Sequence, residues 1–430
     1  MRLSTLIPAA ALIAAATGQA LSAQGTIASR VAQARDGVVR MQFDSRAGAC
    51  GDGRDVVGFR HAMFARNFES YGSWNNTRCV SGPVRVALTL SRGEVTLVKT
   101  QIGGAWPQTD ARVTDLGSVS AREASAYFFS LVPQLETESG KDRLLLPAVL
   151  ADDPAVIQPL LSLARNSART DRTRRQAVQW LGLVGDASII PALVGFAKDG
   201  ASDDYSEKKG MASAAVAALS QLDDNAGVPA LIDLSREPAA GTRHSVAFWL
   251  GQNADPRALR RLHQMIEDTK EQERVRAQAI FALSHGDQTS SAEFQYLRDV
   301  YPRLDSDKLK ESVFQGMQDD DVNGGRWLML RARDASESTK IRRSALFWAG
   351  QREGTPTADI LNFYRDENSA SLREHAIFVL SQRQENAATD ALIRIAKEDG
   401  DSKMRGKALF WLAQKKDPRV TKLISDILVR

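Results

Sequence analysis

The sequence has few of the residues that usually carry catalytic chemistry. Its 430 residues include only 2 cysteines and 5 histidines, and no two histidines stand at the spacing of a metal site. It has no glycine-rich phosphate loop and no serine, histidine and aspartate in an order typical of nucleophilic catalysis. We therefore predict that the protein is not an enzyme and binds no metal ion and no cofactor.

A strong net charge and a long apolar run are also missing. The 56 basic and 52 acidic residues leave a net charge of +4, which by itself does not indicate a nucleic-acid partner. No apolar run reaches the roughly 20 residues of a membrane-spanning helix. The composition, with 43% hydrophobic and 25% charged residues, is typical of a soluble globular protein. We expect no membrane span and no nucleic-acid partner.

The N-terminus has the pattern of a secretory signal peptide. Arg2 supplies a positive charge, residues 6–16 are apolar, and small residues lead to Ala23, as at a cleavage site. No cysteine follows that could carry a lipid. We predict a signal peptide at residues 1–23, cleavage after Ala23, and export as a soluble periplasmic or secreted protein.

Both cysteines, Cys50 and Cys79, fall in the N-terminal third. In an oxidising compartment such a pair is typical of a disulfide. Residues 38–43 alternate loosely between apolar and polar, and residues 83–100 do so more clearly around a turn at Gly93, which predicts a strand and a hairpin. We expect residues 24–115 to form a small β-rich domain pinned by the disulfide.

A helical linker is expected at residues 116–141, because Ser120 and Glu123 have the spacing of a capping box. In the β-rich domain, Asp52 and His61 are the residues that could belong to a ligand site. Asp52 stands between two glycines, which is also ordinary turn chemistry, and His61 has no partner for metal binding. A ligand-sensing or enzymatic head domain, with the rest of the chain as a docking handle, is the alternative function.

The remainder of the chain repeats one short stretch, which is clearest at residues 347–351. Its eight copies have their middle residues at 181, 219, 250, 283, 316, 349, 380 and 412. A near-constant period of this length indicates stacked structural repeats, and each unit has the pattern of two helices. We call the helix that carries the stretch the inner helix and the other the outer helix. We predict that residues 142–430 form an α-solenoid of about nine helical pairs, so the fold is mainly α after a small β-rich domain.

The repeat resembles the HEAT repeat, in particular the HEAT-like repeat of bacterial phycobilin lyases. The most faithful copy is residues 175–186 followed by 190–194, and the resemblance extends from about residue 142 to residue 430. It implies a HEAT-like superhelix but no particular activity, because that family is a scaffold for many tasks. Hydroxylases of HEAT type hold iron with His-Glu pairs, whereas this chain has only the reversed pair Glu374-His375.

Two columns of residues share one face of the predicted inner helices. Phenylalanine stands two positions before the middle residue and glutamine two positions after it, so the two are four apart on a face opposite the apolar core positions. The columns consist of Phe248, Phe281, Phe314, Phe347, Phe378 and Phe410, and of Gln252, His285, Gln318, Gln351, Gln382 and Gln414.

In HEAT arrays the second helix of each pair lines the concave surface, so the resemblance implies that both columns follow a groove, like the ladder of armadillo proteins. Aromatic rings would supply apolar contact, and the amides would supply donors and acceptors to a peptide backbone. The alternative is that the columns pack between neighbouring inner helices. We predict an exported scaffold that binds a protein or extended peptide through these residues; the sequence specifies neither the partner nor the oligomeric state.

Charged residues alternate in sign along the repeats. Basic residues begin most inner helices and acidic residues lie just upstream, which predicts solvated ion-pair ladders between repeats rather than a single-signed phosphate-binding surface. Asp319, Asp321 and Asn323 match the start of a calcium loop, but Leu330 stands where the bidentate glutamate is needed. We therefore predict an acidic turn there and no metal site.

Overall fold

The structure is a computed structural model of the chain. It describes residues 25–59, 62–63, 79–136, 145–205, 210–286, 289–317, 320, 323–415, 417 and 419–420. The predicted signal peptide lies outside these residues. The chain divides into two compact units, Met1–Asp186 and Ala187–Arg430, and residues 142–186 of the predicted array belong to the first unit.

The first unit contains two small sheets. The larger has the strand order β6-β5-β1-β7, with β5 antiparallel to both neighbours and β7 parallel to β1. The smaller has the order β2-β3-β4. The strands are β1 (Gly37–Phe43), β2 (Ala49–Gly51), β3 (Val56–Phe59), β4 (Ala62–Met63), β5 (Val84–Ser91), β6 (Glu94–Ile102) and β7 (Val113–Ser118).

The predicted hairpin is confirmed as β5 and β6. Along β5 every second residue, from Val84 to Leu90, is buried, and the turn at Arg92 and Gly93 has positive φ at both residues, as a tight hairpin requires. β7 was not predicted, because Leu116 is its only buried residue and the strand therefore shows no alternation.

The predicted disulfide between Cys50 and Cys79 is confirmed, with 5.2 Å between the two Cα atoms. It joins β2 to the segment that leads into β5. Next to it, Gly51 and Val80 exchange backbone hydrogen bonds of 3.0 and 2.8 Å. The disulfide therefore connects the smaller sheet to the chain that enters the larger one.

Helices complete the first unit. Ser120 accepts the Glu123 N–H at the start of α2, as the capping box predicts, while the Glu123 carboxylate accepts the N–H of Ile27 in α1 at 2.9 Å. The helices of this unit are α1 (Ile27–Ala32), α2 (Ala121–Ser130), α3 (Val132–Leu135), α4 (Leu146–Leu150), α5 (Ile157–Arg165) and α6 (Asp171–Val184), with a 3-10 turn at η2 (Pro154–Val156).

The second unit is a row of antiparallel helix pairs. The inner helices are α8 (Met211–Ser220), α10 (Ala240–Gly251), α12 (Glu273–His285), α14 (Asp307–Gly316), α16 (Thr339–Gly350), α18 (Ala370–Gln382) and α20 (Ser402–Leu412). The outer helices are α7 (Ile190–Asp199), α9 (Val228–Leu234), α11 (Pro256–Glu267), α13 (Ser291–Val300), α15 (Gly324–Arg333), α17 (Thr357–Asp366) and α19 (Asn386–Glu398). Short 3-10 turns occur at η3 (Ala187–Ile189), η4 (Asp223–Asn225) and η5 (Tyr301–Arg303).

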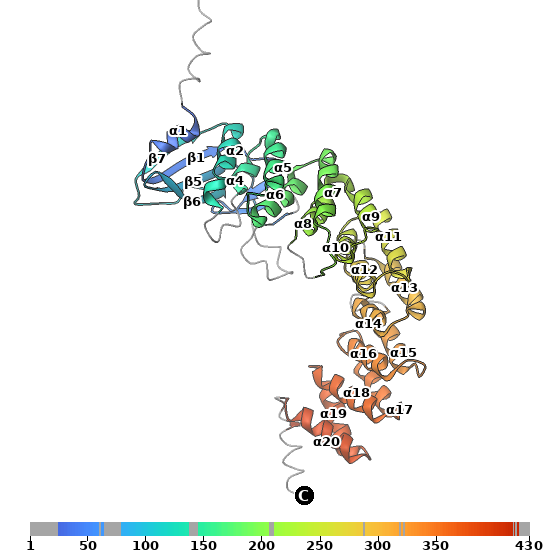
Figure 1. Ribbon diagram of the computed structural model, residues 1–430. Helices are drawn as coiled ribbons and strands as arrows, with labels where there is room; N and C mark the ends of the chain where they lie inside the picture. Colours follow the sequence, from blue (N-terminus) through green and yellow to red (C-terminus); the bar gives the residue numbers. More distant parts are fainter. Residues whose placement is uncertain are drawn as a thin grey trace, which may run out of the picture. The chain divides into compact units, whose positions relative to one another are not determined.

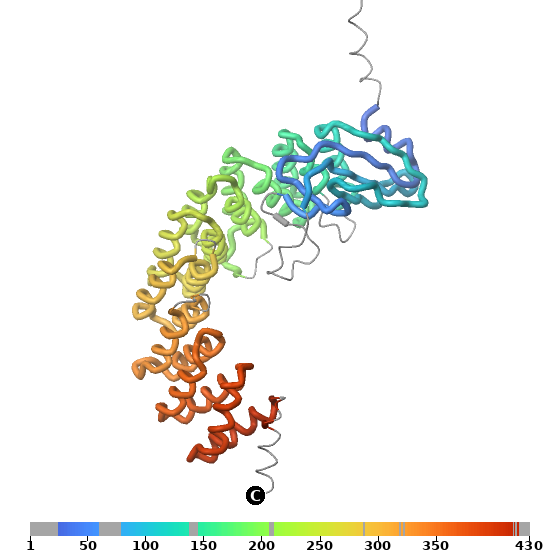
Figure 2. Tube along the Cα trace, turned by 180° about the vertical axis from the view of Figure 1, so that it is seen from behind, coloured from blue at the N-terminus to red at the C-terminus, as the bar shows by residue number. Residues whose placement is uncertain are grey.

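Within this unit each inner helix packs against the next inner helix. Figure 1 shows the inner helices along the concave side of the row and the outer helices along the convex side, and Figure 2 shows the same row from behind. The positions three and four before the middle of the repeat are buried, for example Ala345 and Leu346. The predicted fold class, an α-solenoid after a small β-rich region, is therefore confirmed.

Candidate binding face and cavity

A ladder of ion pairs joins successive repeats. A cation in the first turns of an inner helix binds a carboxylate just before the next inner helix. The pairs are Arg243–Glu271, Arg276–Asp305, Lys310–Glu337, Arg342–Glu367 and Arg373–Asp399. The prediction of pairing between repeats is thus confirmed.

These pairs are less solvated than predicted. The Arg276 side chain is 5% exposed, and its Nε donates to the backbone oxygen of Ile266 at 2.9 Å. Arg342 makes the same bond to the oxygen of Ala332 at 2.8 Å. Each of these arginines therefore also caps the C-terminal end of the outer helix before it.

The ladder shows that one repeat was aligned incorrectly. In most inner helices the ladder cation lies seven positions before the middle residue, as Arg342 lies before Ala349. Lys310 takes this role in α14, so the middle residue there is Met317 and not Gly316. The shift of one residue moves Phe314 from the predicted outward column to the core column, since one residue rotates a helix by about 100°.

The prediction that Phe314 faces a partner is therefore wrong. Phe314 is fully buried, and its ring lies 5.3 Å from that of Tyr301 and 5.8 Å from that of Trp327. Its predicted companion Gln318 lies outside the described residues. In this repeat the aromatic side chain packs the core.

The other five phenylalanines of the column reach the surface. Phe410 is 58% exposed, and Phe248, Phe281, Phe347 and Phe378 are half-buried. Of the residues four positions later, Gln252 and His285 are half-buried, and three are exposed: Gln351, Gln382 and Gln414.

Part of this column also packs laterally. Phe378 in α18 lies 5.4 Å from Trp411 in α20, and Phe281 stacks on His285 of its own helix at 4.4 Å. No hydrogen bond between glutamines of neighbouring repeats is found in the part of the chain that the structure describes. The aromatic rings therefore combine packing with exposure, and the side chains of Gln351, Gln382 and Gln414 are exposed beside them.

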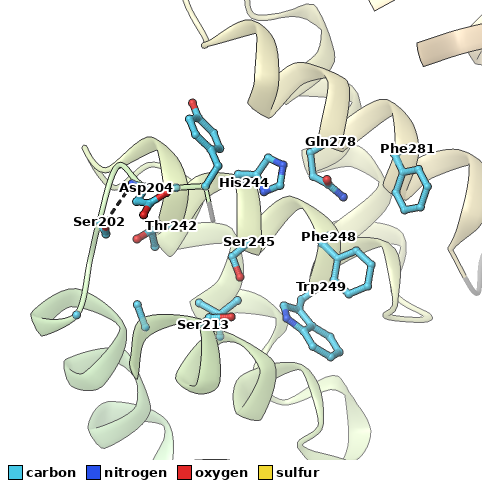
Figure 3. Close-up of a pocket in the computed structure, with 15 residues that line it drawn as sticks. Ser202, Asp204, Ser213, Thr242, His244, Ser245, Phe248, Trp249, Gln278 and Phe281 are labelled. Atoms are coloured by element: carbon cyan, nitrogen blue, oxygen red, sulfur yellow. Dashed lines mark hydrogen bonds between the residues drawn. The ribbon is translucent and has the colours of Figure 1, made fainter. Parts of the chain in front are cut away.

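A cavity of about 490 Å³ lies on the inner-helix face, between α8, α10 and α12. Two residues of the predicted column, Phe248 and Phe281, line it together with Trp249. In Figure 3 these three rings lie at one side, and the polar residues Ser202 and Thr242 lie at the other. Ser245 lies between the two sides.

The segment at residues 200–205 forms one wall and is fixed to the start of α10. The Ala240 N–H donates to Asp203 Oδ1 at 2.7 Å, and the Thr242 N–H donates to the backbone oxygen of Ser202 at 3.2 Å. Between them stands Gly241, where a Cβ atom would lie 2.5 Å from the Ser202 oxygen. Glycine is therefore required for this close approach.

Tyr205 extends the wall toward α12. Its hydroxyl donates to Gln272 Oε1, its ring meets His244 edge-on at 5.3 Å, and the Arg274 guanidinium lies 4.6 Å from the ring centre. Residues of two neighbouring repeats therefore hold the Tyr205 ring at the cavity.

At the cavity, α8 lacks the ladder cation. Ala212 occupies the position of that cation and lines the cavity. Glu237 stands where the acid that pairs with such a cation is found in the other repeats, and it binds Lys198 of α7 at 2.8 Å instead. Sequence reasoning missed this cavity, although the run of small residues in Met211–Ser220 departs clearly from the other inner helices.

A second row of cations follows the glutamine column and was also missed. Arg352, Arg383 and Lys415 come directly after Gln351, Gln382 and Gln414. Arg383 donates to the backbone oxygens of Gly350, Arg352 and Thr355 at 2.8–3.1 Å. Lys415 donates to the Arg383 oxygen at 2.7 Å. These cations tie the end of one inner helix to the end of the preceding one.

The reversed pair Glu374-His375 is not arranged as a metal site. Glu374 binds Lys403 and Lys407. Burial, with the Arg343 charge second, lowers the pKa of His375 to about 4. The neutral ring donates from Nε2 to the Arg343 oxygen at 2.9 Å. Both side chains are thus used within the array.

Of the two head-domain candidates, the structure describes only Asp52. Asp52 accepts the backbone N–H groups of Arg54 and Asp55, both at 2.8 Å, and these bonds lower the pKa of its carboxyl group. It therefore shapes a turn. His61 lies outside the described residues, as do Asp319 and Asp321 of the calcium-like loop. Among the residues that the structure describes, no three His, Cys, Asp or Glu side chains are grouped as metal ligands, and no helix could span a membrane.

The fold and these ladders define an α-solenoid, and comparison with known proteins specifies its type. A family model of HEAT repeats matches residues 157–247, and that of the PBS lyase HEAT-like repeat matches residues 242–268. The chain is a HEAT-repeat protein. A comparison with curated proteins finds no match.

Solved structures with similar helix pairs have low sequence identity. Human deoxyhypusine hydroxylase is 18% identical over 56% of this chain and 89% of its own, with a TM-score of 0.26. Kap121p is 11% identical over 68% of this chain and 39% of its own, with a TM-score of 0.37. The CpcE–CpcF complex of phycocyanin lyase from Nostoc sp. PCC7120 is 17% identical over 63% of this chain and 92% of its own, with a TM-score of 0.26.

Proposed function

We propose that this HEAT-repeat protein is an exported, non-enzymatic scaffold that binds a protein or an extended polypeptide along the inner-helix face of its second unit. The observation that carries the proposal is the set of surface phenylalanines on five of the inner helices: Phe248 and Phe281 on α10 and α12, and Phe347, Phe378 and Phe410 on α16, α18 and α20. A row of partly exposed aromatic rings is typical of an interaction surface. The exposed amides from Gln351 to Gln414 supply donors and acceptors beside it.

The charges of the array support a polypeptide over a nucleic acid. The cations that begin the inner helices, such as Arg276 and Arg342, bind carboxylates before the next inner helix and backbone oxygens at the end of the preceding outer helix. They are therefore committed to the array, whereas phosphate binding needs cations that are free to displace counterions.

Two observations support export. The Cys50–Cys79 disulfide is typical of an oxidising compartment, and residues 1–23 have the pattern of a signal peptide. Sequencing the N-terminus of the protein recovered from outside the cytoplasm tests this part. The expected first residue is Gln24; an intact N-terminus on cytoplasmic protein would contradict export.

Site-specific photo-crosslinking tests the binding face. A photoreactive residue is placed at Gln351, Gln382 or Gln414 and, as a control, at Leu330, which is 54% exposed on the outer helix α15. We expect one discrete polypeptide partner to be crosslinked from the inner-face positions and not from position 330. Crosslinks only from position 330, or none from any inner-face position in whole cells, would contradict the proposal.

Purified partner then allows a quantitative test. The triple variant Phe347→Ala/Phe378→Ala/Phe410→Ala should bind the partner at least tenfold more weakly while its circular dichroism remains that of a folded helical array. Leu330→Ala removes a comparable exposed apolar side chain from the other face and should leave the affinity unchanged.

A further inference from the structure

The cavity between α8, α10 and α12 contains an unexplained polar group. Thr242 is 3% exposed, and its buried hydroxyl oxygen has no hydrogen-bond partner among the residues that the structure describes. A buried hydroxyl that makes no hydrogen bond is unfavourable for folding. The corresponding position of the later inner helices is apolar and buried in every case: Val275, Leu309, Ile341, Leu372 and Met404. In the earlier helix α6 the equivalent residue is also a buried threonine, Thr173, but its hydroxyl is bonded to that of Thr170 at 3.0 Å. Core packing therefore does not account for the Thr242 hydroxyl.

The rest of the lining is amphipathic and poor in cations. Phe248, Trp249 and Phe281 form the aromatic side, and the Ser245 hydroxyl and Gln278 amide lie beside it (Figure 3). Among the lining residues that the structure describes there is no lysine or arginine, and the one carboxylate is that of Asp204, so an anionic group that entered would lose hydration without compensation. A large uncharged group with one polar edge fits this lining.

The cavity also has a suitable size and position. Its volume of about 490 Å³ is within the range of about 300–1,000 Å³ that is typical of pockets which enclose a small organic group. It opens beside Phe248 and Phe281, which belong to the column of the proposed binding face. A side chain from a polypeptide on that face would therefore reach it.

We propose that this cavity is the anchor site of the binding face and receives one large uncharged aromatic side chain, of tryptophan or tyrosine, from the bound polypeptide. This inference rests on the proposed function. The ring lies against the aromatic side, and its polar edge faces the Thr242 end. The other surface phenylalanines contact the polypeptide on either side of this anchor.

Small probes test the chemistry of the cavity without the partner. N-acetyl-tryptophanamide and N-acetyl-tyrosinamide are titrated into the full chain, with N-acetyl-glutamate amide and N-acetyl-alaninamide for comparison, and binding is followed by ligand-observed NMR. We expect the two aromatic probes to bind at least tenfold more tightly than the other two. Equal response to all four probes would overturn the proposal.

Two matched variants locate the binding. Ser245→Trp fills the cavity and should abolish binding of the aromatic probes. Ser344→Trp places the same side chain at the equivalent position of α16, outside the cavity, and should leave binding within twofold of the unmodified protein. Thr242→Val keeps the volume but removes the hydroxyl, and should weaken binding about threefold. Undiminished binding by the folded Ser245→Trp variant would overturn the proposal.

The source of the aromatic group is distinguished with peptides. Peptides from the crosslinked partner are compared with versions in which each tryptophan or tyrosine is replaced by alanine. Loss of binding on one replacement, and on Ser245→Trp, supports the anchor. Peptides that bind the array but are indifferent to both changes overturn the anchor and leave the scaffold function intact. Aromatic probes that bind when no peptide does overturn the scaffold function and identify a small-molecule site.

Discussion

Arg243 and Glu271 are joined by two parallel hydrogen bonds, Nε to Oε2 and Nη2 to Oε1, each 2.8 Å long. They lie 28 residues apart and connect the first turns of α10 to the segment before α12. Arg243 also donates to the backbone oxygen of Glu237 at 2.7 Å. One planar guanidinium therefore holds the ends of three chain segments together, which an ammonium group could not do with the same geometry.

This pair should contribute strongly to the stability of the second unit. The two side chains are 13% and 8% exposed, so Arg243→Gln leaves a carboxylate that is largely removed from water. We expect the free energy of unfolding, measured with urea, to fall by about 2–4 kcal/mol. Arg243→Lys should recover only part of the loss.

The matched control is Arg236→Gln. Arg236 pairs with Asp233 on the surface, where the side chains are 54% and 83% exposed, and such pairs contribute about 0–1 kcal/mol. If Arg243→Gln and Arg236→Gln change stability equally, the ladder does not stabilise the array.

Phe314 and Phe410, which the sequence pattern assigned to one column, should differ in the stability that is lost when each is replaced by alanine. Phe314→Ala removes a fully buried ring that packs on Tyr301 and Trp327, and should cost about 3–5 kcal/mol. Phe410→Ala removes a ring that is 58% exposed and should cost less than about 1 kcal/mol. Thermal unfolding of both variants checks this; similar losses would contradict the corrected register.

This contrast shows what the sequence could and could not predict. The repeat period, the helix pairs and the alternation of charges are local or periodic, and they were recovered. The register of α14 was not, because residues 314–318 imitate the recurring stretch. Only the contact of Lys310 with Glu337, at 2.8 Å, shows that the helix is rotated by one residue.

The cavity was missed for a different physical reason. Ala212 interrupts the periodic row of cations, which is visible in the sequence, but the packing of residues 200–205 against Gly241, where a Cβ would clash, has no periodic signature. The parallel strand β7 was missed likewise, because its pairing with β1 joins segments about 75 residues apart and buries only one side chain of β7.

Arg383 should be the most sensitive of the cations that follow the glutamine column. It is 9% exposed and donates to three backbone oxygens at the end of the preceding repeat. Arg383→Lys should destabilise the array by about 2–3 kcal/mol, since at least one of those oxygens loses its donor. Hydrogen exchange should show the loss in α16 and α18.

Lys415→Ala is the comparison for this row. Lys415 makes a single bond, to the Arg383 oxygen at 2.7 Å, and its loss should cost about 1 kcal/mol. Uniform acceleration of exchange throughout the second unit by Arg383→Lys would contradict a local role, because repeats contact mainly their neighbours.

His375 should make stability depend on pH below neutrality. Burial lowers its pKa in the folded chain from the ordinary 6.5 to about 4, so between these values the unfolded chain binds more protons than the folded one. The contribution of His375 to the free energy of unfolding is therefore fully present above pH 6.5 and is lost as the pH falls toward 4.

The variant His375→Gln keeps a donor for the Arg343 backbone oxygen but does not titrate. The difference in free energy of unfolding between the original protein and this variant should be constant above pH 7 and should shift against the original protein by at most about 1.4 kcal/mol per pH unit below 6.5. Urea unfolding at half-unit steps from pH 4 to pH 8 measures this difference, and parallel curves for the two proteins would show that His375 is accessible to protons in the folded array.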